Sequence, residues 1–186
     1  DVDLEEFGGE YLLCLRGDPV SKTALLSTTI QAMMLSVRLL DAPEKNEGKG
    51  LWPPKLFAFT DDLDSMNRLF FSYLDAEGWV WRDRAKAQYR KNPSRGGYSD
   101  SLATLRDPAS LSGENWSEDK FRAMSEAGQN WEVLKQFGHQ LSALDIVADQ
   151  NSSEKKGVKS EANVVIATSS LEVGFNDPLV GAVFQH

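Results

Sequence analysis

The sequence has few of the residues that several common kinds of site require. It contains one cysteine, Cys14, and two histidines, His139 and His186, among 186 residues. A lone cysteine excludes an intramolecular disulfide and a cysteine-based zinc centre, and neither histidine has a Cys or His partner at ligand spacing. We therefore expect no metal site, and we interpret Cys14 as a buried strand residue.

Long apolar runs are also missing. No stretch approaches the ~18 consecutive apolar residues that span a bilayer, and the start of the chain lacks the basic and apolar regions of a signal peptide. The Gly-x-Ser-x-Gly turn of serine hydrolases is absent too. These absences predict a cytoplasmic domain with no membrane partner, and they leave no catalytic residue to name.

Positive charge is scarce. The chain carries 20 Lys and Arg against 28 Asp and Glu, a net charge of −8. This is the wrong sign for a free-standing nucleic-acid binder, because phosphate binding depends mainly on Lys and Arg that displace counterions. A domain of this charge can hold a nucleic acid through a few neutral groups on one edge, while other domains supply the positive surface.

The apolar spacing predicts an α/β domain. A content of 41% hydrophobic and 26% charged residues is typical of one globular domain. Strand-like runs alternate with stretches of helical spacing, the pattern that builds a mostly parallel sheet flanked by helices. We predict strands at residues 10–16, 55–60, 144–148, 163–167 and 179–185, and helices at residues 27–40, 65–74 and 116–138, the first capped by Ser27 or Thr28 and the last broken near Gly128.

A variable insertion is expected at about residues 77–113. Seven Lys and Arg alternate there with aromatic residues and turn formers. Such a mixture can follow a nucleic-acid backbone. The other interpretation, which we favour at this point, is a solvated insertion whose aromatic residues pack on the domain.

The ends of the chain suggest a piece of a longer protein. The sequence begins at Asp1 without an initiator Met, and it stops after the apolar run at residues 179–185. That run predicts a buried strand, and a natural domain rarely ends inside its core. We therefore expect further sequence on both sides.

Polar residues follow two of the predicted strands. Thr60 and Asp61 come after the run at residues 55–60, and Thr168, Ser169 and Ser170 come after the run at residues 163–167. Ligands of open α/β sheets collect beyond the carboxyl ends of the strands. Hydroxyls and amides at such a turn suit a phosphate oxygen. They can equally serve only to cap the following helix.

Two segments resemble the motifs of a known family. Val-Val-Ile-Ala-Thr-Ser-Ser-Leu-Glu-Val-Gly-Phe-Asn at residues 164–176 resembles motif V of superfamily 2 helicases. Lys-Leu-Phe-Ala-Phe-Thr-Asp-Asp-Leu-Asp-Ser at residues 55–65 is similar to motif IV. Their order and separation match the second RecA-like motor domain of that family, which implies a three-layer RecA-like fold. The likeness is weak over residues 1–17 and 79–113.

The resemblance assigns roles by position. It implies that Thr60, Asp61, Thr168, Ser169 and Ser170 contact the nucleic-acid backbone. It implies further that three residues face the nucleotide and the cleft between two motor domains, namely Glu172, Gly174 and Asn176. Asn176 departs from the family, in which Asp is usual, and an amide can still bond a ribose hydroxyl.

The resemblance also says what the chain lacks. The Walker A and Walker B elements of the first motor domain and the arginine-rich motif VI are absent, so we expect this chain alone to be inactive and its parent protein to hydrolyse ATP with Mg²⁺. Its expected partners are the missing first RecA-like domain and a nucleic acid. We expect DNA rather than RNA, because the Leu-Glu variant of motif V resembles that of bacterial DNA helicases of repair or phage defence. The alternative is a stand-alone α/β module that binds a nucleotide or a protein.

Overall fold

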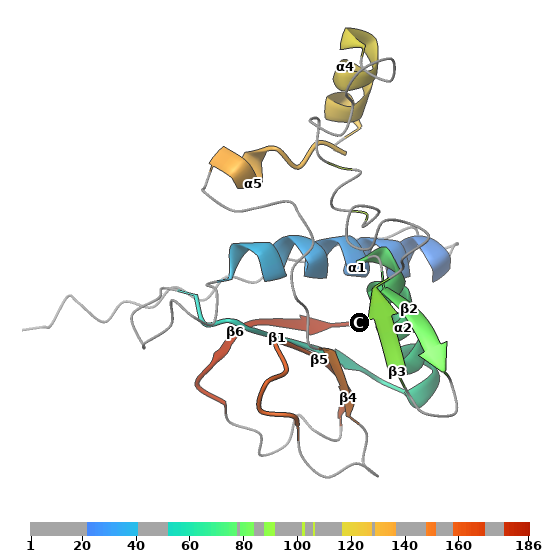
Figure 1. Cartoon of the computed structure of the whole chain (residues 1–186), viewed down its shortest axis with the longest axis vertical. Coiled ribbons are helices and arrows are strands. Elements are labelled where there is room, and N and C mark those ends of the chain that lie inside the picture. Colours follow the sequence, from blue (N-terminus) through green and yellow to red (C-terminus); the bar gives the residue numbers. More distant parts are fainter. Residues whose placement is uncertain are drawn as a thin grey trace, which may run out of the picture.

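A parallel sheet forms the centre of the molecule. The computed structural model describes residues 22–40, 52–77, 79–83, 88–91, 102, 106, 117–127, 129–136, 148–151, 158–169 and 177–186. Four strands lie in the order β4–β5–β1–β6, and every pairing among them is parallel (Figure 1). They are β1 (Lys55–Thr60), β4 (Ala148–Asn151), β5 (Val164–Thr168) and β6 (Val180–Gln185). Helices flank the sheet, which confirms the α/β class and is consistent with the three-layer arrangement predicted.

The two central strands are buried along almost their whole length. All of β1 is buried, as is β5 from Val164 to Ala167. Such continuous apolar runs suit parallel strands that are covered on both faces. Alternate residues face opposite ways: Leu56 and Ile166 join one hydrophobic cluster, and Phe57 and Val165 join a second.

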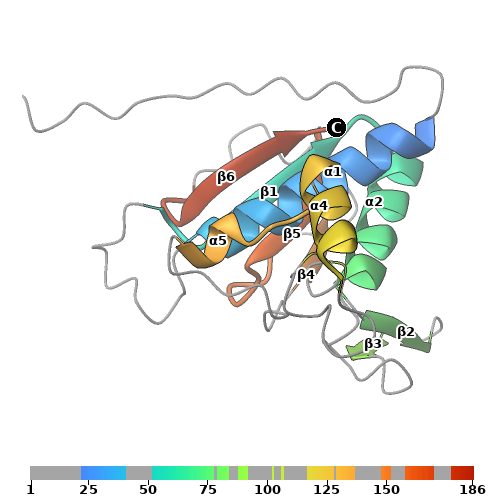
Figure 2. The same cartoon turned by 90° about the horizontal axis from the view of Figure 1, so that it is seen from above.

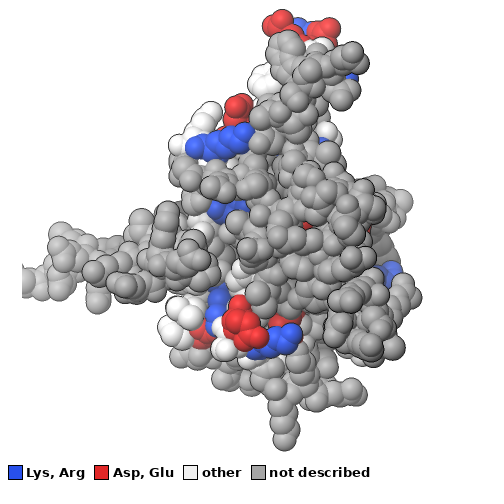
Figure 3. Space-filling view, viewed as in Figure 1, with Lys and Arg blue, Asp and Glu red and all other residues white. Residues whose placement is uncertain are grey.

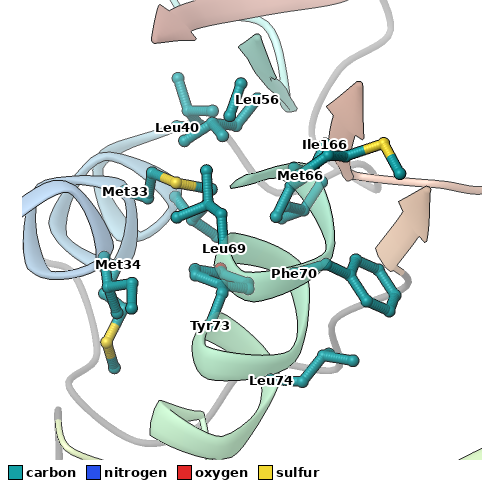
Figure 4. Packing of buried hydrophobic residues seen from close by; sticks show 14 of the residues in the cluster. Met33, Met34, Leu40, Leu56, Met66, Leu69, Phe70, Tyr73, Leu74 and Ile166 are labelled. Carbon is teal, nitrogen blue, oxygen red and sulfur yellow. The ribbon is translucent and has the colours of Figure 1, made fainter. Parts of the chain in front are cut away.

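Helices α1 (Lys22–Leu39) and α2 (Leu63–Ala76) cover the face of the sheet that carries the larger cluster (Figure 2). The apolar residues of α2 recur at helical spacing, which places them in one stripe toward the sheet. Figure 4 shows this stripe packed against α1 and the strands. Replacing one such residue by Ala costs about 2–5 kcal/mol. The stripe consists of Met66, Leu69, Phe70, Tyr73 and Leu74.

Helix α1 begins five residues earlier than predicted. It starts at Lys22, so Ser27 and Thr28 lie inside the helix and do not cap it. Residues 22–26 are mostly good helix formers, which extends the helix beyond the apolar spacing used for the prediction. A hydroxyl in a helix can bond the carbonyl four residues back, and Thr29 Oγ1 donates to the Leu25 carbonyl at 3.1 Å.

A buried ion pair joins the two helices. Arg38 of α1 donates to both carboxylate oxygens of Glu77 at 2.8 Å, and both side chains are fully buried. Burial also raises the pKa of the neighbouring Tyr73 well above its usual value, and the Glu77 carboxylate adds to this. Glu77, which the sequence interpretation placed at the start of the insertion, therefore belongs to the core.

The last strand forms as predicted, but it is not buried. β6 pairs with β1 at the border of the described sheet, and Val183 in its middle is 62% exposed. An edge strand has one neighbour instead of two, so an apolar sequence alone did not reveal its exposure. Gly181 lets β6 pass close to the loop before β1, since a Cβ there would lie 2.0 Å from the Pro53 carbonyl oxygen.

An ion pair closes the amino end of the sheet. Lys55 Nζ lies 2.7 Å from Asp177 Oδ2, and the backbone N–H of Lys55 donates to the Leu179 carbonyl. Burial acts to raise the pKa of Asp177, but hydrogen bonds from Lys55 and the Leu179 N–H outweigh it, so this pKa lies below its usual value. The start of β1 is thereby tied to the segment that leads into β6.

The remaining described elements lie outside the sheet. The two helices predicted at residues 116–138 are present as α4 (Glu118–Glu126) and α5 (Val133–Gln136). A hairpin of β2 (Trp79–Asp83) and β3 (Gln88–Lys91) lies beside α2 and was not predicted. β4 shares only Ala148 with the strand predicted at residues 144–148. The rest of that prediction and the strand predicted at residues 10–16 lie outside the described residues. Within the described part of the chain, no helix has the length and apolarity to cross a membrane.

Candidate ligand-binding edge

The motif IV-like and motif V-like segments form neighbouring parallel strands. β1 pairs with β5 in a register that sets Thr60 opposite Thr168. Parallel strands end at the same edge of a sheet, so Thr60 and Thr168 lie side by side at that edge. The residues that end the motif IV-like and motif V-like strands are therefore neighbours across the sheet.

The strand order reverses between these same two strands. In the order β4–β5–β1–β6, the chain leaves β1 toward the β4 edge of the sheet. It leaves β5 in the opposite direction, toward β6 at the other edge. In open α/β sheets, ligands bind outside the carboxyl ends of the strands at this kind of switch point. The location between Thr60 and Thr168 is the binding position that the topology favours.

The carboxyl ends of the four strands carry a row of polar residues, which we call the carboxyl row. It runs from β4 to β6 and consists of Asn151, Thr168, Thr60 and His186. Asn151 pairs in register with Ala167, and the His186 N–H donates to the Phe59 carbonyl at 2.9 Å. An amide, two hydroxyls and an imidazole suit recognition by hydrogen bonds more than by charge.

Thr60 shapes the edge and is hardly accessible to a ligand. Its side chain is buried, at 1% exposure for the residue, and Oγ1 donates to the Asp62 carbonyl at 3.1 Å. The hydroxyl thus closes the turn between β1 and α2, and Asp62, not Thr60, caps the helix. A contact of Thr60 Oγ1 with a nucleic acid requires this bond to break.

The N-terminus of α2 already holds an anion. The carboxylate of Asp62 caps the helix by accepting from the Ser65 N–H at 2.8 Å and from Ser65 Oγ at 2.9 Å. These hydrogen bonds lower its pKa. Asp61 beside it is exposed. The two carboxylates disfavour a phosphate at this helix end, so an anionic ligand fits better on the β5 side of the edge.

Thr168 and Ser169 lie on that β5 side. Thr168 is half-buried at the end of the strand, and Ser169 after it is exposed. Both are more accessible than Thr60. Other predicted contacts lie outside the described residues, namely Ser170, Glu172, Gly174 and Asn176.

His186 was missed as an edge residue. Its Nδ1 lies 2.9 Å from Thr29 Oγ1, whose own proton goes to the Leu25 carbonyl. When that proton is given to Leu25, the hydroxyl accepts from Nδ1–H, and the lone pair of the neutral ring then lies on Nε2. Burial lowers the pKa of His186, although the Asp61 carboxylate acts against this. Only the parallel pairing of β6 with β1 brings His186 to this edge, and no local sequence signal marks it.

Neither a metal centre nor a known relative identifies this edge. Among the residues the structure describes, no group of three His, Cys, Asp or Glu side chains is placed to hold a metal ion. Comparison with protein families, with characterised proteins and with solved structures found no match to the chain.

Proposed function

We propose that this chain is the second motor domain of an ATP-dependent nucleic-acid helicase or translocase. The observation that carries the proposal is the pairing of β1 with β5, which sets Thr60 opposite Thr168 at the point where the strand order reverses. The strands of the two segments that resemble helicase motifs are therefore neighbours in space, although 98 residues separate the two segments in the sequence. Such adjacency is necessary for them to act on one ligand.

In this proposal the strand is held by neutral groups. Thr168 Oγ1 and the Ser169 hydroxyl donate to phosphate oxygens. Hydroxyl donors give position and little net attraction, which agrees with the acidic composition of the chain. The Thr60 hydroxyl stabilises the turn between β1 and α2 by donating to the Asp62 carbonyl.

The motor role requires a partner domain. ATP with Mg²⁺ binds the first RecA-like domain of the same protein, and the sheet edge at Thr168 and Ser169 closes on it. The open and closed states of the cleft between the two motor domains differ in their affinity for ATP and for its hydrolysis product. This difference in affinity moves the protein along the nucleic-acid strand. The proposed location is the cytoplasm, and DNA is the proposed substrate.

The test removes one hydroxyl at the edge. Thr168→Val keeps the β-branched shape and deletes the hydroxyl donor. We expect it to weaken the binding of a fluorescein-labelled oligothymidine by roughly tenfold, because a hydrogen bond to a charged group contributes about 1.5 kcal/mol. Fluorescence anisotropy at low salt measures the change. Thr168→Ser retains the hydroxyl and should bind nearly as the unaltered chain does.

A matched control lies at the other end of the same strand. Ser160 is an exposed hydroxyl residue that precedes β5, so Ser160→Ala should leave oligonucleotide binding unchanged. Equal affinities of the Thr168→Val and Thr168→Ser variants would falsify the contact. In a protein that also carries the first motor domain, Thr168→Val should lower nucleic-acid-stimulated ATP hydrolysis more than basal hydrolysis.

A second candidate is an α/β module that binds a nucleotide or a protein without motor activity. The exposed carboxylates of Asp61 and Asp62 beside the switch point favour it, because they oppose a polyanion. Isothermal titration with ATP, ADP and oligothymidine separates the two candidates. Nucleotide binding without any oligothymidine binding supports the module.

A further inference from the structure

The imidazole of His186 is held from two sides at the end of β6. The backbone N–H of His186 donates to the Phe59 carbonyl of β1 at 2.9 Å, and Nδ1 lies 2.9 Å from Thr29 Oγ1 of α1. Figure 2 shows the end of β6 beside the first half of α1. Main chain and ring are thus fixed by different elements, and the half-buried side chain needs no ligand to define its position.

The second ring nitrogen, Nε2, is available to a ligand. Among the described residues, the contacts of His186 involve its N–H, its Nδ1 and the charge of Asp61, and none of them occupies Nε2. Nε2 is also not one of the enclosed polar atoms without a partner in this part of the chain, so solvent reaches it. In the neutral ring with Nδ1–H bonded to Thr29, Nε2 presents a lone pair.

Burial favours the neutral form of this ring. It lowers the pKa of His186, and the exposed Asp61 carboxylate in the turn after β1 acts in the opposite direction. The other elements near the ring add no free charge among the described residues: α1 faces it with the uncharged Thr29, and the Asp62 carboxylate is bonded to Ser65. A pKa below the ordinary value of about 6.5 leaves Nε2 an acceptor at pH 7 and above.

Strand alternation sets three residues of the carboxyl row on one face of the sheet. Ile166 of β5 and Phe184 of β6 pack on the side that carries the larger cluster, and Thr168 and His186 follow them by two residues. Thr60 pairs with Thr168 in register and shares this face. Neighbouring strands lie about 4.8 Å apart, so about 10 Å separate Thr168 from His186 across Thr60.

The two ends of this row offer a ligand different chemistry. On the β5 side the Thr168 hydroxyl can donate to a phosphate oxygen, whereas on the β6 side Nε2 of His186 and the Asp61 carboxylate accept. A phosphate on the β6 side would be repelled by Asp61. That end therefore suits a part of a nucleotide that donates hydrogen bonds, a base N–H or a sugar hydroxyl.

Surface charge gives little further direction to a ligand. Figure 3 shows the Lys and Arg side chains of the described residues interspersed with Asp and Glu on the visible face. Alternating charges produce no extended field of one sign. Hydrogen bonds at the sheet edge are consequently the groups that can orient a bound nucleotide.

We propose that His186 binds a hydrogen-bond donor of the nucleic acid through Nε2, on the β6 side of the phosphate contact at Thr168. The inference rests on the proposed function in taking a nucleic acid as the ligand and Thr168 as the phosphate contact. It adds an orientation, with the phosphate at β5 and the base or the sugar toward β6. Thr29 is a positioning residue, because it acts only through the His186 ring.

The first test uses two amides that each replace one ring nitrogen. His186→Asn keeps a donor near the position of Nδ1 but has no atom at the position of Nε2. It should weaken binding of fluorescein-labelled oligothymidine or oligouridine by roughly fivefold, the effect of one neutral hydrogen bond. His186→Gln can place its amide oxygen at the position of Nε2 and should retain most of the affinity.

Fluorescence anisotropy at about pH 8, where the imidazole is neutral, measures both variants. Thermal unfolding confirms that each is folded. A ring that served only to pack on α1 would tolerate Asn, which can still bond Thr29, at least as well as Gln. Equal affinities of the two variants for both oligomers, or tighter binding by His186→Asn, overturn the proposal.

Three oligomers distinguish the source of the donor. Oligothymidine offers a base N–H, oligouridine adds a 2′-hydroxyl on every sugar, and an abasic deoxyribose oligomer offers neither along its length. A loss in His186→Asn with both base-bearing oligomers assigns the base N–H to Nε2, and a loss with oligouridine alone assigns the 2′-hydroxyl. A similar loss with the abasic oligomer means that His186 contacts the phosphate backbone, and the proposal is then wrong.

The second test is the sign of the pH dependence. Protonation of Nε2 turns the acceptor into a donor, so affinity should fall as the pH drops from about 8 to about 5. His139→Gln leaves His186 as the only histidine of the chain, and the fall should persist in it without any substitution at His186. His186→Gln should not show it. Affinity that rises toward acidic pH in His139→Gln indicates an imidazolium–phosphate contact and overturns the proposal, as does affinity that stays constant.

This inference and the proposed function fail in different ways. If Thr168→Val weakens binding and His186→Asn does not, the inference is wrong and the motor-domain proposal stands. If His186→Asn weakens binding and Thr168→Val does not, the nucleic acid lies on the β6 side alone and the contact at Thr168 is wrong. If the unaltered chain binds none of the three oligomers, both are wrong.

Discussion

The two ends of the central sheet are built from different kinds of polar group. At the amino end, Lys55 and Asp177 form an ion pair at 2.7 Å that ties β1 to the approach of β6. At the carboxyl end, the strands finish in Asn151, Thr168, Thr60 and His186. The first arrangement fixes the position of a strand, and the second leaves the half-buried Thr168 and His186 where they can meet a ligand.

The difference indicates at which positions of this fold a substitution should cost little stability. Charged pairs away from the carboxyl end stabilise the packing only while both partners remain, because a buried charge without its partner is costly. Neutral hydroxyls at the carboxyl end contribute less to stability and can be changed with smaller cost. Substitutions at the two ends should therefore separate stability from binding.

The largest expected effect is on the ion pair between the helices. Glu77→Gln leaves the fully buried Arg38 charge without its carboxylate, and we expect the free energy of unfolding to fall by about 3–5 kcal/mol. Urea denaturation followed by circular dichroism measures this.

Asp64→Asn is the matched control, since it removes the exposed pair with Arg68 at 2.8 Å. Exposed pairs contribute about 0–1 kcal/mol, so the control should remain close to the unaltered chain. A small loss in Glu77→Gln would mean that the pair is not essential to the packing of α1 on α2.

An intermediate effect is expected at the amino end. Asp177→Asn removes the charge that Lys55 pairs with, and the free energy of unfolding at neutral pH should fall by about 1–3 kcal/mol. The pKa of Asp177 is lowered in the folded chain, so its contribution is complete above the unfolded value of about 4 and is lost as the pH falls through the folded pKa.

The pH dependence supplies the check on this second prediction. Thermal unfolding of both proteins between neutral and acidic pH should show their stability difference shrinking below about pH 4. A difference that stays constant to low pH would contradict the role assigned to the Asp177 charge. Oligothymidine binding at neutral pH should be the same in both, since this end of the sheet lies away from the carboxyl row.

The smallest effect is electrostatic and lies at the carboxyl end. The Asp61 carboxylate raises the pKa of His186 against the lowering by burial, so Asp61→Asn should lower that pKa further. Asp61 is exposed and water screens its charge, which keeps the change small. Titration of the imidazole Cε1–H signals by NMR measures it, and Asp177→Asn should leave the His186 pKa unchanged.

Much of the fold followed from local patterns. The run from Val164 to Ala167 predicted a strand covered on both faces, and the spacing of Met66, Leu69 and Tyr73 predicted the helix after β1. These features are decided within a few residues, by alternation, helical period and hydrogen bonds that a side chain makes to its own backbone.

Other features required pairings that local patterns do not specify. The hairpin at Trp79 was obscured by charged and turn-forming residues, and α1 began earlier because hydroxyl residues were mistaken for caps. His186 became part of the candidate site only through the pairing of β6 with β1. The exposure of Val183 likewise depends on which strand has a single neighbour.

The sequence by itself determined the α/β class, the buried central strands and the hydroxyl residues that follow them, because side-chain period and turn chemistry act over short distances. Only the tertiary structure decided that Thr60 faces Thr168, that the Thr60 hydroxyl is enclosed in its own turn, and that Glu77 lies in the core against Arg38. Strand order and burial depend on contacts between residues far apart in the chain, and the same local pattern is compatible with several such arrangements.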